Sequence, residues 1–297
     1  MKPSPHGAHN WHPMSFNPRT GLVYIPVHEI PYAFKRDPAF RYQPGAWNLG
    51  IDWDVAERFP RELVSGHLLA WDPVAQKEVW RAQYTSPWNG GTLTTAGNLV
   101  FQGTAHGSFA AYRASDGKLL FETPAGTGIV AAPVSYLVDG VQYVTVMAGW
   151  GGAFALAGGD AAAAAGVTDN RGRILTFRLG GSAVLPAQEA VEREIAAIPA
   201  ELDPALVRQG RGAYTRWCSV CHGPGVESGG VLPDLRKSVP EILDPESFAA
   251  IVLEGAFQAR GMPSFSEFLS AAEVGAIRQY VLSRRAALLA ETASGAR

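Results

Sequence analysis

The residues best suited to chemistry in this chain are Cys218, Cys221 and His222, which stand together in the stretch CSVCH. The chain has no other cysteine. A Cys-x-x-Cys pair can form a redox disulfide, supply half of a zinc site or attach a c-type haem. Structural zinc needs four ligands, and a second pair is missing. A redox disulfide would want βαβ surroundings, which this region lacks, although a disulfide stays open as the alternative. The haem interpretation also uses the histidine, because two thioethers form at the cysteines and His222 ligates the iron.

A haem iron in a cytochrome needs a sixth ligand, which is often a methionine sulfur. Met262 lies between Gly261 and Pro263 in GMPSF, a rigid loop after the cysteine motif. The alternative is an ordinary loop methionine that fills a gap in the packing. Pro233 in VLPDL is placed to accept the Nδ1–H of His222 through its carbonyl, as a proline does in small c-type cytochromes. Such an outer bond fixes the ring and its basicity.

Two predicted helices flank these ligands. Asp203 is a predicted N-cap and Pro204 the first helical residue of a helix that runs into the cysteine motif. Ser270 and Glu273 form the S-x-x-E capping box of a second helix. Its apolar stripe has helical spacing and comprises Val274, Ile277, Val281 and Leu282. Residues of about 200–290 resemble a class I cytochrome c domain, which is all α.

Composition limits the function of the whole chain. A length of 297 residues predicts about two domains. The net charge of −2 gives no electrostatic case for binding nucleic acid. No stretch approaches the roughly 18 apolar residues that a membrane span needs, so we expect no transmembrane segment. The first residues, MKPSPHGAHNWHP, lack the apolar core of a signal peptide. That conflicts with a covalent haem, which is normally attached outside the cytoplasm.

Residues 1–180 are predicted to be β structure, because glycine and proline punctuate short strands. The clearest passage predicts four strands near 91–95, 99–103, 108–113 and 118–122. Four antiparallel strands joined by tight turns form one blade of a propeller. An earlier group of strands, from WHPMSF to KEVWRAQ, predicts another blade. The third, from AAPVSYLV to RILTFRL, has an Asp139-Gly140 hairpin turn but only three strands.

An internal repeat supports the blades. The stretches AWDPVAQKEVW at 70–80 and AYRASDGKLLF at 111–121 align with an offset of 41 residues. The repeat predicts that its terminal aromatic residue, Trp80 or Phe121, docks between neighbouring blades. Coincidental similarity of two hairpins is the alternative.

The predicted domains are a partial propeller at 1–180, an extended linker at 181–202 and a cytochrome c domain at 203–297. Three blades cannot close a ring, since closed propellers need about 4–8. We therefore expect two open blade faces that carry large apolar side chains, for which we name Trp71, Trp80, Phe101 and Tyr112.

Taken together, these stretches resemble the quinohaemoprotein alcohol dehydrogenases, in which a pyrroloquinoline quinone (PQQ) propeller is fused to a cytochrome c. The matching stretches are HNWHPMSFNPRTGLVYIPV, WNGGTLTTAGNLVFQGTAHGSFAAY, VMAGWGGAF, RILTFRLGG, CSVCHG and GMPSF. The resemblance implies an eight-bladed propeller, haem c, PQQ and calcium. It implies that the catalytic Asp, the calcium ligands and a vicinal disulfide belong to earlier blades, so no catalytic residue is assigned in this chain. It also implies a periplasmic location.

The resemblance and the glycine-rich sequence assign one side of the quinone pocket to this chain. By resemblance Asn10 and Trp11 contact PQQ; the alternatives are a turn asparagine and a core tryptophan. Gly152 and Ala153 in GWGGA are candidates for a close approach of the backbone, or for a simple bend. Trp88 and Asn89 are candidates at the start of an inner strand. Three histidines are expected to be surface or loop residues rather than ligands: His9, His12 and His106.

The leading functional hypothesis is oxidation of a primary alcohol at PQQ. The electrons then leave through the haem to an external acceptor, which is a copper protein, a cytochrome or a quinone-linked partner. Because the base and the calcium ligands are expected elsewhere, this chain alone is expected to be inactive as an alcohol dehydrogenase. The alternative hypothesis is a stand-alone c-type electron-transfer protein whose β part docks a partner.

Overall fold

The structure is a computed structural model that describes residues 1–42, 48–52, 55, 61–157, 170–186, 194–199, 201–228 and 231–294. The chain forms two compact units. The β unit comprises Met1–Ala39 and Ile51–Glu189, and the helical unit comprises Phe40–Gly50 and Ala190–Arg297. The predicted boundaries at 180 and 203 remain a prediction, because the linker proposed between them spans the division between the units.

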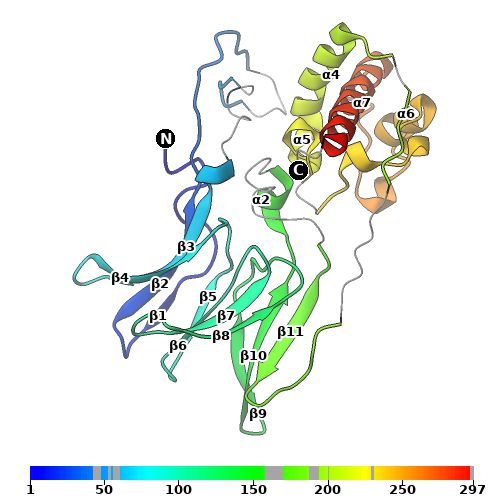
Figure 1. Ribbon diagram of the computed structural model, residues 1–297. Helices are drawn as coiled ribbons and strands as arrows, with labels where there is room; N and C mark the ends of the chain where they lie inside the picture. Colours follow the sequence, from blue (N-terminus) through cyan, green and yellow to red (C-terminus); the bar gives the residue numbers. More distant parts are fainter. Residues whose placement is uncertain are drawn as a thin grey trace. The chain divides into compact units, whose positions relative to one another are not determined.

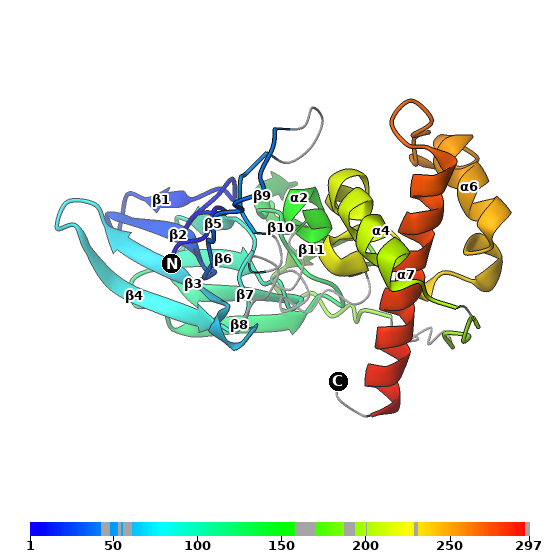
Figure 2. The ribbon, with the colours of Figure 1, turned by 90° about the horizontal axis from the view of Figure 1, so that it is seen from above.

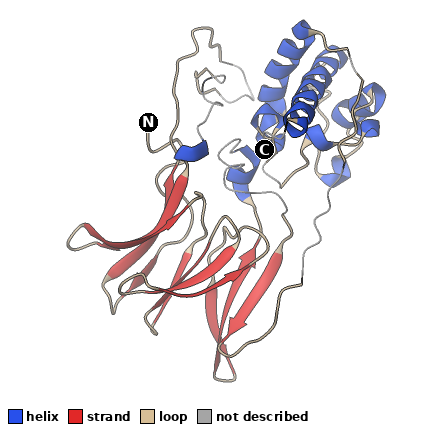
Figure 3. Cartoon of the chain, viewed as in Figure 1, coloured by secondary structure: helices blue, strands red, loops and turns tan. Residues whose placement is uncertain are grey.

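The described residues of the β unit form three antiparallel sheets, drawn in red in Figure 3. The first has the order β1 (Ser15–Asn17), β2 (Leu22–Glu29), β3 (Ser65–Asp72) and β4 (Lys77–Tyr84). The second has β5 (Thr92–Thr95), β6 (Leu99–Gly103), β7 (Ser108–Arg113) and β8 (Leu119–Pro124). The third has the order β11 (Arg173–Arg178), β10 (Val141–Ala148) and β9 (Val134–Val138). These are the four-, four- and three-stranded groups that the sequence predicts. The short elements of the unit are η1 (Arg61–Leu63) and α2 (Gly152–Ala157).

The repeat is also visible in the strand pairing. The β3–β4 register shifts between Ala70 and Trp71, and the β7–β8 register shifts between Ala111 and Tyr112. Both bulges therefore fall at equivalent positions of the 41-residue repeat. A bulge bends its strand and increases the local twist.

Trp80 docks between the first two sheets, as the repeat predicts. It is 9% exposed and its indole N–H donates to the carbonyl oxygen of Ala114 at 3.0 Å. Gly117, in the β7–β8 turn, leaves room for the ring, because a Cβ there would lie 2.6 Å from Trp80 Cε3. The equivalent Phe121 is 44% exposed and meets the edge of the Phe177 ring at 6.0 Å between ring centroids.

We expect Trp80→Phe to lower the free energy of unfolding of the β unit by about 1–2 kcal/mol. The substitution removes one buried hydrogen bond and leaves a small void. The matched control is Phe121→Leu at the equivalent, half-exposed position, which should cost about 0.5 kcal/mol or less. Urea unfolding of both variants measures the difference, and equal losses at the two positions would contradict the docking of Trp80.

The expectation about the open faces is wrong for three of its residues, one of which, Phe101, packs against the core between the second and third sheets. Trp80 and Tyr112 lie in the core between the first and second sheets and are 9% and 7% exposed. A second core joins Phe109 of the second sheet to Val146 and Leu175 of the third. The third sheet carries a group of exposed large apolar side chains: Val134, Tyr136, Leu137, Val138, Met147 and Ile174. Others are exposed on β8 of the second sheet, namely Leu119, Leu120 and Phe121.

The helical unit is built from α4 (Pro204–Trp217), α5 (Ser219–His222), α6 (Pro245–Leu253) and α7 (Ala271–Ala293). Its short 3₁₀ turns are η2 (Pro224–Val226), η3 (Leu235–Lys237), η4 (Pro240–Ile242) and η5 (Gln258–Arg260). Figures 1 and 2 show α4 lying against α7. None of the helices in the described part of the chain is long and apolar enough to cross a membrane.

The predicted helix starts are confirmed. The Asp203 side chain accepts the backbone N–H of Ala205 at the start of α4. The capping box of Ser270 and Glu273 is complete at the start of α7. The end of the predicted linker packs on this unit, because Ile198 contacts the helical core and Gln279 Nε2 donates to the carbonyl oxygen of Glu201.

Candidate functional site

Cys218 and Cys221 stand where α4 passes into α5. Cys218 is the residue between the helices, and its carbonyl accepts the backbone N–H groups of Cys221 and His222 at 3.1 and 2.9 Å. Both sulfurs are free thiols. Cys218 is buried and Cys221 is exposed, and burial together with the nearby Cys221 raises the pKa of Cys218 to about 12. This single tight turn therefore presents two unpaired thiols and a histidine.

His222 has the orientation that the sequence predicts. Its ring is 8% exposed, and Nδ1 donates to the carbonyl oxygen of Pro233 at 3.1 Å. Since Nδ1 carries the proton, Nε2 is the nitrogen with the free electron pair. Burial lowers the pKa of His222, with the Pro233 bond and Asp234 acting in the opposite direction. The ring is thus a neutral imidazole, the form that can ligate a metal ion.

Apolar residues surround this turn. Cys218 belongs to the core cluster of the helical unit, and Met262 packs against the same cluster. Met262 follows Gly261, whose φ of +92° lies in the left-handed region. The backbone N–H of Met262 donates to the carbonyl oxygen of Phe257 at 3.2 Å. The Tyr214 hydroxyl donates to the carbonyl oxygen of Gly223 at 2.9 Å. The remaining apolar wall includes Trp217, Leu235 and Phe265. Two thiols, a neutral imidazole and a thioether beside an apolar wall fit a c-type haem.

The β unit brings several of the predicted quinone-side residues together. Trp11 is 53% exposed on one side and stacks on His12 on the other, with ring centroids 4.2 Å apart. A Cβ on Gly152 would lie 3.9 Å from Trp11 Cζ2, so the start of α2 borders the indole. Both polar groups of the Asn10 amide bind nearby backbone. Its Nδ2 donates to the His6 carbonyl oxygen, and its Oδ1 accepts the backbone N–H of Trp11. The side chain of Ala153 lies outside the described residues.

Trp88 and Asn89 lie before β5 and are buried, with 3% and 1% exposure. Asn89 is a structural bracket, since Nδ2 donates to the Ser86 carbonyl and Oδ1 accepts the Ala105 N–H. Trp88 stacks on Phe154, with ring centroids 4.2 Å apart. The structure thus places this pair in the interior and not on an exposed wall.

Two buried histidines complete an aromatic cluster with Trp11, Trp88 and Phe154. His12 was expected in a loop or on the surface; it is in a loop, but it is 1% exposed. His28 is 2% exposed and stacks on Trp88 with ring centroids 4.6 Å apart. His106 is exposed and His9 half-buried. The alternating burial of β2 could have located His28, which is in phase with Leu22 and Tyr24, whereas nothing in the sequence locates His12.

The hydrogen bonding of the two histidines is incomplete within the described residues. His28 Nδ1 accepts the Trp88 backbone N–H at 3.1 Å, while His28 Nε2, Trp88 Nε1 and both ring nitrogens of His12 have no protein partner there. Burial, with His9 as a smaller cause, lowers the pKa of His12 to about 4. Burial, then His12, His9 and His6, lowers the pKa of His28 to about 3. Both rings are therefore neutral near pH 7.

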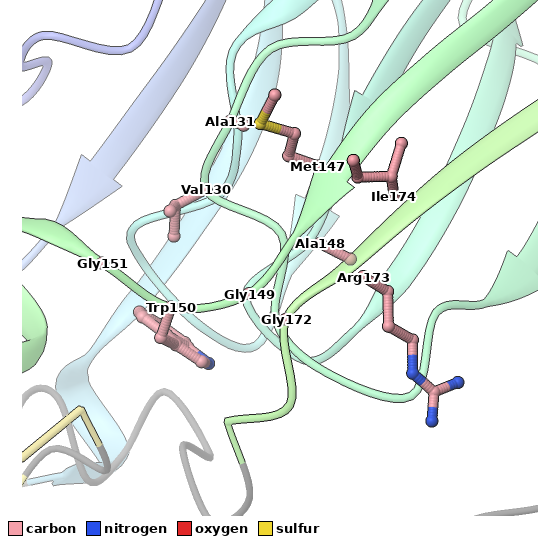
Figure 4. A pocket seen from close by; sticks show the side chains of 10 residues that line it. All are labelled: Val130, Ala131, Met147, Ala148, Gly149, Trp150, Gly151, Gly172, Arg173 and Ile174. Carbon is pink, nitrogen blue, oxygen red and sulfur yellow. The ribbon is translucent and has the colours of Figure 1, made fainter.

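A shallow apolar depression of about 410 Å³ lies on the third sheet, beside the start of α2 (Figure 4). Arg173 is the charged residue among those that line it, and the others are Val130, Ala131, Met147, Ala148, Gly149, Trp150, Gly151, Gly172 and Ile174. In the described part of the chain, no group of three or more His, Cys, Asp or Glu side chains is arranged to hold a metal ion.

Two family models match the chain. Residues 63–144 match the β-propeller domain of glucose, ethanol and alcohol dehydrogenases, described as PQQ. Residues 205–281 match a cytochrome family described as cytochrome c oxidase, cbb3-type, subunit III. The first match falls in the β unit and the second in the helical unit.

Relatives match nearly the whole chain. Quinohemoprotein alcohol dehydrogenase ADH IIB of Pseudomonas putida is 48% identical over 96% of this chain and 41% of its own length. Quinohemoprotein alcohol dehydrogenase of Comamonas testosteroni is 44% identical over 94% of this chain and 40% of its own. The solved structure of ADHIIG from Pseudomonas putida HK5 aligns with a TM-score of 0.85 and 42% identity, covering 98% of this chain and 43% of that one. The chain belongs to the quinohaemoprotein alcohol dehydrogenase family.

The resemblance that the sequence indicates is therefore confirmed, as is the combination of propeller blades with a cytochrome c domain. The chain spans about two fifths of the length of these quinohaemoprotein alcohol dehydrogenases and corresponds to their C-terminal part. The family name states a quinone and a haem, and the same two cofactors were expected for this chain. Individual site residues in this chain stay predictions.

Proposed function

We propose that this chain is the haem-bearing part of a PQQ- and haem c-dependent alcohol dehydrogenase that passes electrons to an external acceptor. The observation that carries the proposal is the CSVCH turn, in which Nδ1 of the neutral His222 is bonded to Pro233 beside the apolar wall that includes Met262. A periplasmic location fits this proposal, because covalent haem requires attachment outside the cytoplasm. The alcohol and the acceptor are part of the proposal only as classes: a primary alcohol, and a copper protein, a cytochrome or a quinone-linked partner.

The residues of the helical unit have separate roles in this proposal. Cys218 and Cys221 would hold the haem through thioether bonds to its two vinyl groups. Nε2 of His222 and the sulfur of Met262 would ligate the iron. A bound haem c supplies one-electron transfer. The Pro233 carbonyl orients the His222 ring and raises its basicity.

The β unit contributes one wall for PQQ in this proposal. The exposed face of Trp11 offers a flat surface, and His12 supports the indole from behind at 4.2 Å. Gly152 keeps the adjacent space free of a side chain. Asn10 positions Trp11, because its Oδ1 accepts the backbone N–H of Trp11. We assign neither the catalytic base nor the calcium ligands to this chain.

The axial ligands can be tested by absorption spectroscopy of the chain with haem attached. We expect low-spin haem whose oxidised form shows the weak sulfur-to-iron band in the far red, and Met262→Ala should abolish that band. Met147→Ala is the matched control, because Met147 is 65% exposed on the third sheet of the β unit. Survival of the band in Met262→Ala would show that another residue is the sixth ligand. Cys218→Ser should leave the haem attached through one thioether.

A second function, that of a stand-alone electron-transfer protein, is favoured by one observation. The four proposed haem residues all lie in the helical unit, whereas the β unit supplies only a wall for PQQ. We expect the 297-residue polypeptide, supplied with PQQ and Ca²⁺, to show no haem reduction on addition of ethanol or 1-butanol. A general base must lie within hydrogen-bond reach of the hydroxyl proton, and we assign that base elsewhere. Alcohol-dependent reduction by the purified polypeptide would show that these residues suffice for oxidation.

A further inference from the structure

Two adjacent arginines of α7 bind the two loops that follow His222, the proposed iron ligand, in the chain. Arg284 Nε donates to the carbonyl oxygen of Gly225 at 2.9 Å, in the turn that follows the CSVCH stretch. Arg285 Nη1 donates to the carbonyl oxygens of Arg236 and Ser238 at 2.8 and 2.7 Å, in the loop that follows VLPD. One point on a single helix thus restrains both loops.

Arg285 is an unusual residue for this task because it is only 2% exposed. Besides the two bonds from Nη1, its Nε and Nη2 donate to the carbonyl oxygen of Ala196 at 3.0 and 2.5 Å. A buried charge is costly unless several hydrogen bonds satisfy it, and bonds from a charged donor are stronger than those between neutral groups. The guanidinium therefore has a fixed position, and the three carbonyls that it binds are fixed with it.

Arg236 extends this restraint to the carbonyl that faces the ligand. Its guanidinium bonds both carboxylate oxygens of Asp234, through Nε at 2.9 Å and Nη2 at 2.6 Å. Asp234 is the residue directly after Pro233. Arg236 Nη1 also lies 3.5 Å from Glu227 Oε2, on the loop that follows His222. Arg236 is 3% exposed, so this connection is shielded from water.

We propose that Arg285 and Arg236 are positioning residues that hold the Pro233 carbonyl against Nδ1 of His222 and thereby set the reduction potential of the haem. The inference rests on the proposed function, since it needs His222 as the iron ligand. A firm bond to Nδ1 makes the imidazole a stronger electron donor, and outer hydrogen bonds of this kind tune the potential of the metal. A stronger donor favours ferric iron, so loosening the bond favours ferrous iron.

The direction in which the reduction potential changes distinguishes a positioning role of Arg285 from a purely electrostatic one. Deleting a positive charge near a haem favours the more positive ferric iron, which is the opposite of the effect of a loosened Pro233 bond. Arg285→Lys keeps the positive charge but cannot make all of the guanidinium's hydrogen bonds to the three carbonyls. An ammonium is a compact donor at the end of a flexible side chain. The substitution therefore tests the geometry of the three carbonyl contacts alone.

The experiment uses the full chain with haem covalently attached. At a fixed ambient potential near the midpoint of the unsubstituted protein, Arg285→Lys should raise the ratio of reduced to oxidised haem at least threefold. Solvent exchange of the hyperfine-shifted His222 Nδ1–H signal should become at least tenfold faster. Arg278→Lys is the matched control, because Arg278 of α7 also donates to a main-chain carbonyl, that of Leu243 at 2.5 Å. Both readouts should be unchanged in the control.

The proposal is overturned if Arg285→Lys matches Arg278→Lys in both readouts while its haem remains low-spin. Where Arg285→Lys does not yield haem-loaded protein, Arg236→Lys supplies the same test on the opposite side of the loop, with the same expected directions. Absence of covalent low-spin haem in the unsubstituted chain would instead refute the proposed function. The two failures are therefore distinguishable.

Discussion

Replacing Gly210 by alanine is expected to destabilise the helical unit by about 3 kcal/mol or more, at the upper end of the cost of overpacking. Gly210 is buried where α4 crosses α7. A Cβ there would lie 1.8 Å from the carbonyl oxygen of Ala276 and 2.9 Å from the backbone nitrogen of Ile277. Because the obstacle is the backbone of α7, no side chain can rotate away, and the helices must separate.

The separation would reach the proposed haem site. Tyr214, one turn after Gly210, is fully buried and packs on Tyr280 of α7 with ring centroids 5.4 Å apart. Its hydroxyl donates to the carbonyl oxygen of Gly223, next to His222. The total stability of a domain is only about 5–15 kcal/mol. We therefore expect Gly210→Ala to lose much of its haem-loaded fraction as well.

The matched control is Gly212→Ala in the same helix, where no atom lies within 4 Å of the Cβ position. Alanine is a better helix former than glycine, so this variant should gain about 0.5–1 kcal/mol. Urea unfolding of both variants, followed by far-UV circular dichroism, measures the contrast. Equal stability of the two variants would mean that α4 and α7 do not approach as closely as the structure shows.

Lowering the pH from 7 to 4.5 is expected to destabilise the β unit by on the order of 5 kcal/mol, through His12 and His28. Both side chains are buried, at 1% and 2% exposure, with folded pKa values of about 4 and about 3. In the unfolded chain each titrates near 6.5. Below pH 6.5 the two histidines therefore bind more protons in the unfolded chain than in the folded chain. The free energy of unfolding consequently falls as the pH falls. Each histidine contributes roughly half of the loss by pH 4.5, and neither contributes above pH 7.

The experiment is urea unfolding of the full chain between pH 7 and 4.5, followed by tryptophan fluorescence, because most tryptophans lie in residues 1–157. His12→Phe should remove about half of the pH dependence, and it breaks no hydrogen bond within the described residues, because both ring nitrogens lack a protein partner there. His106→Gln is the control, because His106 is exposed and should leave the pH dependence intact. A stability that is flat across this range would show that water or charge partners reach the two buried rings.

Features that depend on neighbouring residues in the chain followed from the sequence. Asp203 caps α4 and Ser270 caps α7 because a cap needs only a side chain within three residues of the helix start. The Pro233 contact of His222 was also predicted, because the motif resembles that of small c-type cytochromes, in which a proline carbonyl accepts this N–H. The repeat predicted the docking of Trp80, because an alanine, a lysine and a terminal aromatic residue recur at one offset of 41 residues.

Only the tertiary structure determined features that depend on segments far apart in the sequence. Gly210 is required because α7 crosses α4 there. The sequence around a helical glycine does not indicate which distant segment packs against it. His12 is buried because Trp11 covers it and residues of β2 and the loop before β5 surround it, whereas its local sequence is that of an exposed loop. Arg285 reads as a surface arginine of a charged helix, yet it is buried because three carbonyls from two distant loops converge on it. Hydrophobic periodicity and capping report on one segment at a time, while burial and hydrogen bonding are settled by whichever segments the folded chain brings together.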